Sequence, residues 1–194
     1  MLTNELKDYV NPTAKIRRLA LGGELISVVR GLYETDRSIP GYYLAPIIYG
    51  PSYLSFEFAL AYYSLIPEAV YNFTSATFEK KKEKHYTTPF GTFYYRDIPS
   101  EAYPIGIVLH SENGYGFQIA SAEKAICDQL YKISPLKNRG ELEYLLFEDL
   151  RIDKEEFFQL KMVDLIEMAN LYHTQNHKLL QAYLRRRLKN GSDY

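Results

Sequence analysis

The chain has one cysteine, Cys127, and no tryptophan among its 194 residues. A single cysteine excludes an intramolecular disulfide, so we expect a reducing compartment, the cytoplasm. No apolar run approaches the roughly 20 residues that a membrane span requires. The polar start also lacks the basic and then apolar pattern of a signal peptide. The sequence therefore predicts a cytoplasmic protein without membrane association.

The chain also has little net charge. The formal value of −1 excludes a protein that coats nucleic acid through a general excess of positive charge. Any DNA binding must therefore come from local basic patches. The length is sufficient to bury a substantial hydrophobic core.

A helix followed by a small two-stranded ribbon is predicted for residues 11–35. Asn11 suits the N-cap, and Pro12 suits the first helical position. The Gly22-Gly23 pair ends the helix. The helix is followed by an apolar, β-branched segment, a turn at Arg30-Gly31 and a second short segment. This pattern predicts two antiparallel strands joined by the turn.

With a further short helix over residues 4–10, this order is that of a winged helix-turn-helix, whose second helix enters the major groove. Lys15, Arg17 and Arg18 lie off the apolar face of the predicted helix, and Arg30 lies at the ribbon turn. These four bases could contact phosphates. The alternative is an ordinary amphipathic helix whose charges are merely solvated.

The middle of the chain predicts a helix and about five strands. The helix is expected within residues 51–67, capped by Ser52. Strands are expected at 70–77, in a hairpin over 85–98, and in the pair 105–110 and 115–119, whose turn contains Asn113-Gly114. Because short turns join them, most should be antiparallel.

The remainder predicts helices. Ser121 caps the first of them, in which Lys124 and Asp128 form an i, i+4 pair. Asn176 is expected to cap the last helix, which carries Arg185, Arg186 and Arg187. These arginines could be a second contact with DNA or with an acidic partner, or they could simply favour the helix end. The fold class is thus α+β, with a short winged helix-turn-helix-like module docked on a mixed domain that has a small antiparallel sheet and a helical C-terminal half.

The sequence offers no pattern typical of an enzyme. It has no Gly-rich phosphate loop. His173 and His177 have the spacing of zinc helices, but Thr174 stands where a metalloprotease has glutamate, and no third ligand is evident. Cys127 is expected to be a buried, inert thiol. We therefore predict a protein that is not an enzyme and holds no metal or cofactor, and a small hydrolase or transferase is the least favoured reading.

Five segments in order resemble the AbiEi family, the antitoxins and transcriptional regulators of type IV toxin–antitoxin systems. They are GELISVVRGLYE at 23–34, PSYLSFEFALAYYSLIP at 51–67, VYNFTSAT at 70–77, TPFGTFYYRDIP at 88–99 and GFQIASAEKAICDQLY at 116–131. The resemblance implies a winged-helix module over residues 1–36, clipped at its start, and an AbiEi-like C-terminal α+β domain over residues 37–194. It also implies that Thr13, Lys15, Arg17 and Arg18 are the helix contacts to DNA, with Arg30 at the ribbon tip.

The same resemblance implies a repressor that binds inverted repeats in its own operator. Such an antitoxin counters a nucleotidyltransferase-like toxin without forming a stable complex with it. Because a clipped module makes few contacts, binding should need two copies, by homodimerisation or by cooperative binding to repeats. The alternative is a protein–protein interaction module that keeps the fold without working DNA binding.

Overall fold

The structure is a computed structural model that describes residues 6, 8–112 and 114–191. It combines helices with two sheets, and the fold is α+β. The helices are α2 (Pro12–Leu21), η1 (Gly41–Leu44), α3 (Ala45–Ile48), α4 (Phe56–Tyr62), α5 (Ala122–Tyr131), α6 (Arg139–Tyr144), the π-helical turn η2 (Leu145–Asp149), α7 (Lys154–Gln159), α8 (Met162–Asn170) and α9 (Gln175–Gly191). The strands are β1 (Ile26–Val29), β2 (Leu32–Glu34), β3 (Tyr53–Leu54), β4 (Phe73–Thr77), β5 (Lys84–Thr88), β6 (Gly91–Asp97), β7 (Ile107–Glu112) and β8 (Tyr115–Ala120).

The larger sheet has six strands in the order β5-β6-β4-β3-β8-β7. The β5–β6 and β7–β8 hairpins confirm the two predicted from their turns. The five expected strands are present as β4–β8, and three of the five pairings in this sheet are antiparallel, as expected for most of them. The expected antiparallel sheet needs correction, because the unpredicted strand β3 pairs with β8 in parallel and β4 pairs with β6 in parallel. The sheet is therefore mixed, and the two-residue strand β3 joins its two halves.

The segment at 51–67 contains more than the single predicted helix. Ser52 is buried and precedes strand β3, and the helix begins only at Phe56. Ser55, not Ser52, occupies the N-cap position. The apolar spacing that predicted the helix is shared by the buried strand before it, so the periodicity alone could not separate the two.

The helices of the C-terminal half are confirmed, and Ser121 caps α5 by accepting a hydrogen bond from the Lys124 N–H at 3.2 Å. Asn176 is not the cap of α9. It lies inside that helix, 2% exposed, where its amide donates to the carbonyl oxygens of Leu130 and Ile133 at 3.1 and 3.0 Å. A buried asparagine thus donates hydrogen bonds to backbone carbonyl groups at the C-terminal end of α5, which would otherwise lack partners there.

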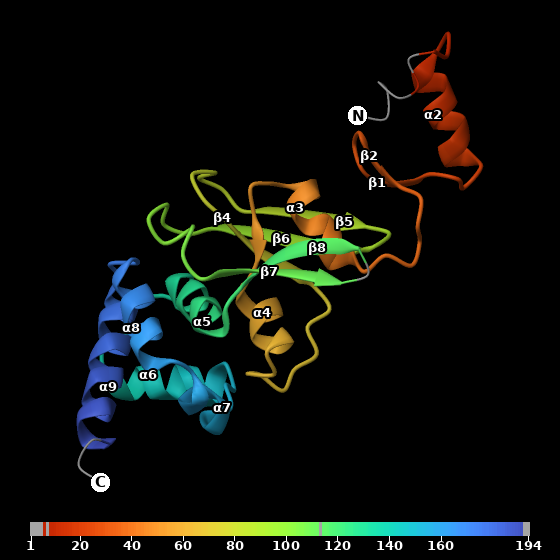
Figure 1. Ribbon diagram of the computed structural model, residues 1–194. Coiled ribbons are helices and arrows are strands. Elements are labelled where there is room, and N and C mark those ends of the chain that lie inside the picture. Colours follow the sequence, from red (N-terminus) through yellow and green to blue (C-terminus); the bar gives the residue numbers. More distant parts are fainter. Residues whose placement is uncertain (1–5, 7, 113, 192–194) are drawn as a thin grey trace.

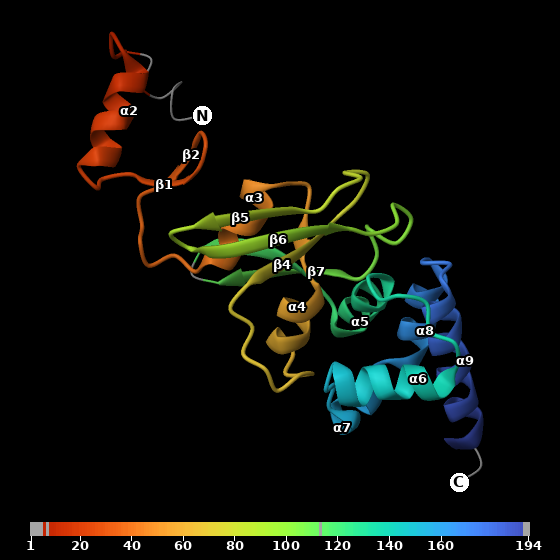
Figure 2. The same ribbon diagram turned by 180° about the vertical axis from the view of Figure 1, so that it is seen from behind.

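One hydrophobic cluster runs from Val28 in β1, through the larger sheet, to Leu184 in α9. The ribbon β1–β2 is thereby joined to the rest of the protein through Val28. Figures 1 and 2 show α2 at one end of the molecule, the sheet in the middle and α6–α9 at the other end. None of the helices in the described part of the chain is both long and apolar enough to cross a membrane.

Candidate nucleic-acid interface

Helix α2 is built as the sequence predicted. The Asn11 side chain accepts a hydrogen bond from the Ala14 N–H at 3.0 Å, and Pro12 stands in the first turn. At the other end the N–H of Gly22 bonds back to helix carbonyls, and Gly23 has a φ of 78°, which a residue with a side chain rarely adopts. Only Ile16 of this helix is buried. Most of the surface of α2 is consequently open to a partner.

The predicted contact residues of α2 lie on that open surface. Thr13, Arg17 and Arg18 are exposed, and neither arginine forms an ion pair with any described residue. Lys15 is half-buried, with its ammonium 5.3 Å from the centre of the Tyr9 ring. The guanidinium groups are therefore available to bind an anion.

The ribbon β1–β2 brings one further predicted base to this module. Its strands pair Ile26 with Glu34 and Val29 with Leu32, and Gly31 has a φ of 85° in the turn between them. Arg30 is exposed at that turn. A helix followed by a two-stranded ribbon with a basic tip is the order expected for the second half of the predicted winged helix-turn-helix.

The first half of that motif is not confirmed. Of the helix predicted over residues 4–10, residues 4, 5 and 7 lie outside the described residues, and the described ones form turns and bends in which the Tyr9 N–H donates to the Leu6 carbonyl at 3.0 Å. In both ribbon views, no helix from the described remainder of the chain lies beside α2. No other described part of the chain therefore supplies the missing first helix of the motif.

Arg37 is a residue that the sequence analysis missed. It is exposed, and one of its guanidinium nitrogens lies 3.9 Å from the point that a side-chain carbon on Gly23 would occupy. The chain therefore returns beside the end of α2 and adds a base there. No local signal could have revealed this, because Arg37 follows the ribbon in a segment that reads as a linker.

The three predicted arginines of α9 lie at the opposite end of the molecule from α2 (Figures 1 and 2). Arg185 and Arg186 are exposed, and Arg185 donates to Gln181 at 3.3 Å. Arg187 stacks on Phe158, with 3.7 Å between the guanidinium carbon and the ring centre. One copy of the chain thus has two separate basic surfaces instead of one continuous one.

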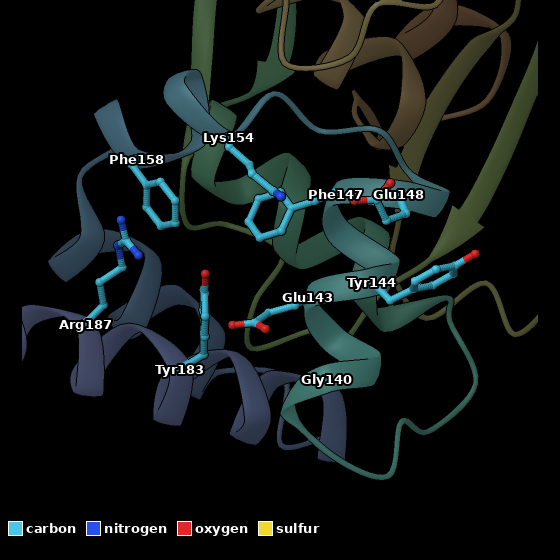
Figure 3. A pocket seen from close by; sticks show the side chains of 9 residues that line it. All are labelled: Gly140, Glu143, Tyr144, Phe147, Glu148, Lys154, Phe158, Tyr183 and Arg187. Carbon is cyan, nitrogen blue, oxygen red and sulfur yellow. The ribbon is translucent and has the colours of Figure 1, made fainter.

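Arg187 also borders a pocket of about 490 Å³ between α6, η2, α7 and α9. Figure 3 shows the Tyr183 hydroxyl and the Glu143 carboxylate directed toward this space, with the Phe158 ring beside Arg187. Two of its bases are held over rings, since the Lys154 ammonium lies 5.2 Å from the centre of Phe147. The walls of the pocket therefore carry both positive and negative side chains, and this mixture does not favour the binding of either an anion or a cation.

The Lys124–Asp128 pair of α5 is confirmed, but it is buried and not on the surface, with side chains only 1% and 0% exposed. The Lys124 ammonium lies 3.3 Å from one carboxylate oxygen and donates to the Ala102 carbonyl at 2.7 Å. Burial lowers the pKa of Lys124, and the nearby Asp128 carboxylate opposes that shift. The pair needs further hydrogen bonds, because burying charges costs free energy unless they are well satisfied.

Residues far away in the sequence supply these bonds. Asp128 accepts from the Ser55 and Tyr53 hydroxyls at 2.6 and 3.0 Å, and the Tyr172 hydroxyl bridges Asp128 and Lys124. The tyrosines are at most 3% exposed, so the group has no open access for a substrate. We name these five residues the buried polar cluster and assign it a structural role, joining β3, α5 and the end of α8.

His177 is buried beside this cluster. Its ring stacks on Tyr172 with centres 4.3 Å apart, and Nε2 donates to the Cys127 carbonyl at 2.9 Å. Burial lowers the pKa of His177 to about 4 and raises the pKa of the Cys127 thiol. His173 is exposed beside Glu101. Among the described residues, no group of three or more potential ligand side chains could hold a metal ion.

No protein-family model matches the chain, and no curated protein sequence is significantly similar to it. The resemblance to the AbiEi family therefore stays a prediction.

Proposed function

We propose that this protein is a sequence-specific DNA-binding transcriptional regulator that reads its operator with α2 and the β1–β2 ribbon. The observation that carries the proposal is a set of exposed bases on one protruding module, none of which forms an ion pair with a described residue. Arg17 and Arg18 are on the helix, Arg30 is at the ribbon tip, and Arg37 lies beside the helix end. A protruding helix can enter a major groove while the ribbon tip contacts the neighbouring backbone.

The local excess of positive charge on this module is also consistent with binding to DNA through a few phosphate contacts. Residues 12–30 contain four bases and one acid, whereas the whole chain has a net charge of −1. A few phosphate contacts give weak binding that depends strongly on salt, because each contact releases counterions. Two modules on an inverted repeat would then supply the remaining affinity and the specificity.

The test is binding of the purified protein to the DNA upstream of its own gene, measured by fluorescence anisotropy against a scrambled duplex at several salt concentrations. We expect the Arg17→Ala, Arg18→Ala double variant to weaken specific binding by about 2–3 kcal/mol. The slope of log K against log salt should decrease by about two units, because two phosphate contacts are lost.

The matched control is the Arg185→Ala, Arg186→Ala double variant, which removes two exposed arginines at the other end of the molecule. It should leave both the affinity and the salt slope unchanged. Equal effects of the two double variants would show general attraction to DNA and would contradict recognition by α2. Equal affinity of the native protein for both duplexes would contradict sequence-specific binding.

The antitoxin role is a further part of this proposal, and the resemblance described above is its support. If it is correct, co-expression of this chain should restore the growth of cells that express a nucleotidyltransferase-like toxin encoded beside it. The toxin should not co-purify with the chain. Persistent growth arrest would leave a regulator without antitoxin activity.

A protein partner is the second candidate for the same module. Leu21 at the end of α2 is 80% exposed, and an exposed leucine beside Arg17 and Arg18 suits an acidic protein surface with an apolar spot. Under this alternative, Leu21→Ala would abolish capture of the partner, whereas DNA affinity would be negligible in the native protein. DNA binding that survives Leu21→Ala favours the regulator.

A further inference from the structure

Strand β7 forms one outer edge of the six-stranded sheet, and β5 forms the other. The edge at β7 is apolar and open. Leu109 is 71% exposed and Val108 is 37% exposed. An outer strand of this kind offers unpaired backbone groups to another strand.

The hydrogen bonds to β8 identify which residues of β7 have backbone groups that face away from the described sheet. The Ser121 N–H donates to the Gly106 carbonyl at 2.7 Å, and this pair continues the register in which Val108 faces Ile119. Alternate residues of an antiparallel strand bond to the same neighbour. Gly106, Val108 and His110 therefore bond to β8. The N–H and C=O groups of Ile107, Leu109 and Ser111 point away from the sheet.

The other edge of the sheet is protected against pairing. Strand β5 begins with Lys84, which is the last residue of the charged run 79–84, EKKKEK. Lysine on an edge strand is a common device against unwanted strand addition, because pairing would desolvate its charge. In β7 the residues from Ile107 to Leu109 carry no charge. The two edges thus differ, and only β7 is suited to accept a strand.

We propose that β7 is a dimer interface, in which β7 of a second copy of this chain pairs with it in antiparallel orientation about a two-fold axis at Leu109. In this register Leu109 faces Leu109 of the partner subunit, and Ile107 faces Ser111 of the partner subunit. These are the residues with outward backbone groups, so each such pair can exchange both of its hydrogen bonds. The two sheets become one continuous sheet across the dimer.

A second copy fits this edge better than an unrelated strand does. A two-fold axis presents the same patch on both subunits, so the most exposed apolar side chain of β7 meets its own copy and both are buried. In the same register Val108 faces the partner's His110, which places an aromatic ring against the other exposed apolar side chain. The dimer also supplies two copies of α2, although the inference does not depend on DNA binding.

The first experiment is light scattering after size-exclusion chromatography of the full chain, from about 1 to about 100 µM, the range that brackets a weak interface. We expect the mass to rise with concentration from 22.6 kDa toward twice that value. Leu109→Lys should hold the mass at 22.6 kDa throughout. Thr87→Lys, the same change at an exposed site on the β5 edge, should behave like the native chain. A native chain that stays monomeric, or a Leu109→Lys variant that still dimerises, would overturn the proposal.

The second experiment tests the register without relying on the lysine variant. Leu109→Cys should form a reducible disulfide-linked dimer, because residues paired across the axis have Cα atoms about 5.5 Å apart, within disulfide range. Ser111→Cys is the matched control, since the two copies of residue 111 would lie about 13 Å apart along the strands. The native Cys127 is buried and should not react. No cross-link at position 109, or equal cross-linking at 111, would overturn the register. Neither experiment uses DNA, so the outcome is independent of the proposed function.

Discussion

Asp128 is the residue on which the buried polar cluster depends. Its carboxylate is fully buried, and it receives hydrogen bonds from Tyr53, Ser55 and Tyr172 while it neutralises Lys124. A buried pair contributes little net stability when intact, but removal of one partner leaves the other charge uncompensated. The cost of losing Asp128 should therefore be much larger than the net contribution of the pair.

We expect Asp128→Asn to lower the free energy of unfolding by about 3–5 kcal/mol, measured by urea denaturation. The control is Glu143→Gln, which breaks another i, i+4 pair, Arg139–Glu143, at 3.2 Å on the surface. That change should cost less than about 1 kcal/mol, because water screens exposed charges. Similar losses in the two variants would mean that burial does not set the cost at Asp128.

His177 should make stability depend on pH. The folded protein protonates His177 only near pH 4, whereas the unfolded chain does so near 6.5. Between these values the unfolded state binds more protons, so the free energy of unfolding rises with pH. The contribution is fully present above about pH 6.5 and is lost as the pH falls to about 4, a change of about 3 kcal/mol.

Denaturation of the native chain and of His177→Gln across this pH range checks that expectation. The variant should lose most of the pH dependence between 4 and 6.5, because glutamine does not titrate. His173→Gln removes an exposed histidine and should keep the native slope. An unchanged slope in His177→Gln would assign the pH dependence to other groups.

At the scale of the element, α2 is the helix on which the proposed function depends, and packing against the rest of the protein gives it little stability. It buries one side chain, Ile16, so its end-capping contributes a large share of its stability. The Asn11 cap satisfies a backbone N–H that would otherwise lack a partner. Loss of the cap should therefore weaken the helix and any DNA binding together.

We expect Asn11→Ala to cost about 1 kcal/mol of local stability in α2. Amide hydrogen exchange in Pro12–Leu21 should accelerate by a corresponding factor of about five. Asn138 caps α6 in the same manner, accepting from the Glu141 N–H at 3.0 Å. Asn138→Ala should therefore accelerate exchange in α6 and leave that in α2 unchanged. Faster exchange in α2 from both variants would indicate global destabilisation instead.

At the scale of the whole molecule, the elements with local signals could be predicted from the sequence. The β5–β6 hairpin and the α5 cap depend on residues within a few positions of one another. The Lys124–Asp128 pair was also predicted, because its i, i+4 spacing is a local feature.

Features that depend on distant segments could not be predicted. The burial of Lys124 results from Ala102 and Tyr172, which lie 22 and 48 residues away. The parallel pairing of β3 with β8 has no local signal, because β3 is only two residues long. The position of α9 relative to α2 likewise follows from packing and not from the pattern of either helix. The candidate interface was predicted from charge and spacing, except for Arg37, which the fold brings beside α2.

The short strand β3 has a consequence for how the chain folds. The β5–β6 and β7–β8 hairpins are local and can form within about 10 µs. Joining the two halves requires Leu54 to meet Ile119, which are 65 positions apart, so a long loop must close first. Contacts of large sequence separation slow folding, because the chain loses entropy before they stabilise it. We therefore expect this closure to limit the folding rate and the contacts of Asp128 with Tyr53 and Ser55 to form with it.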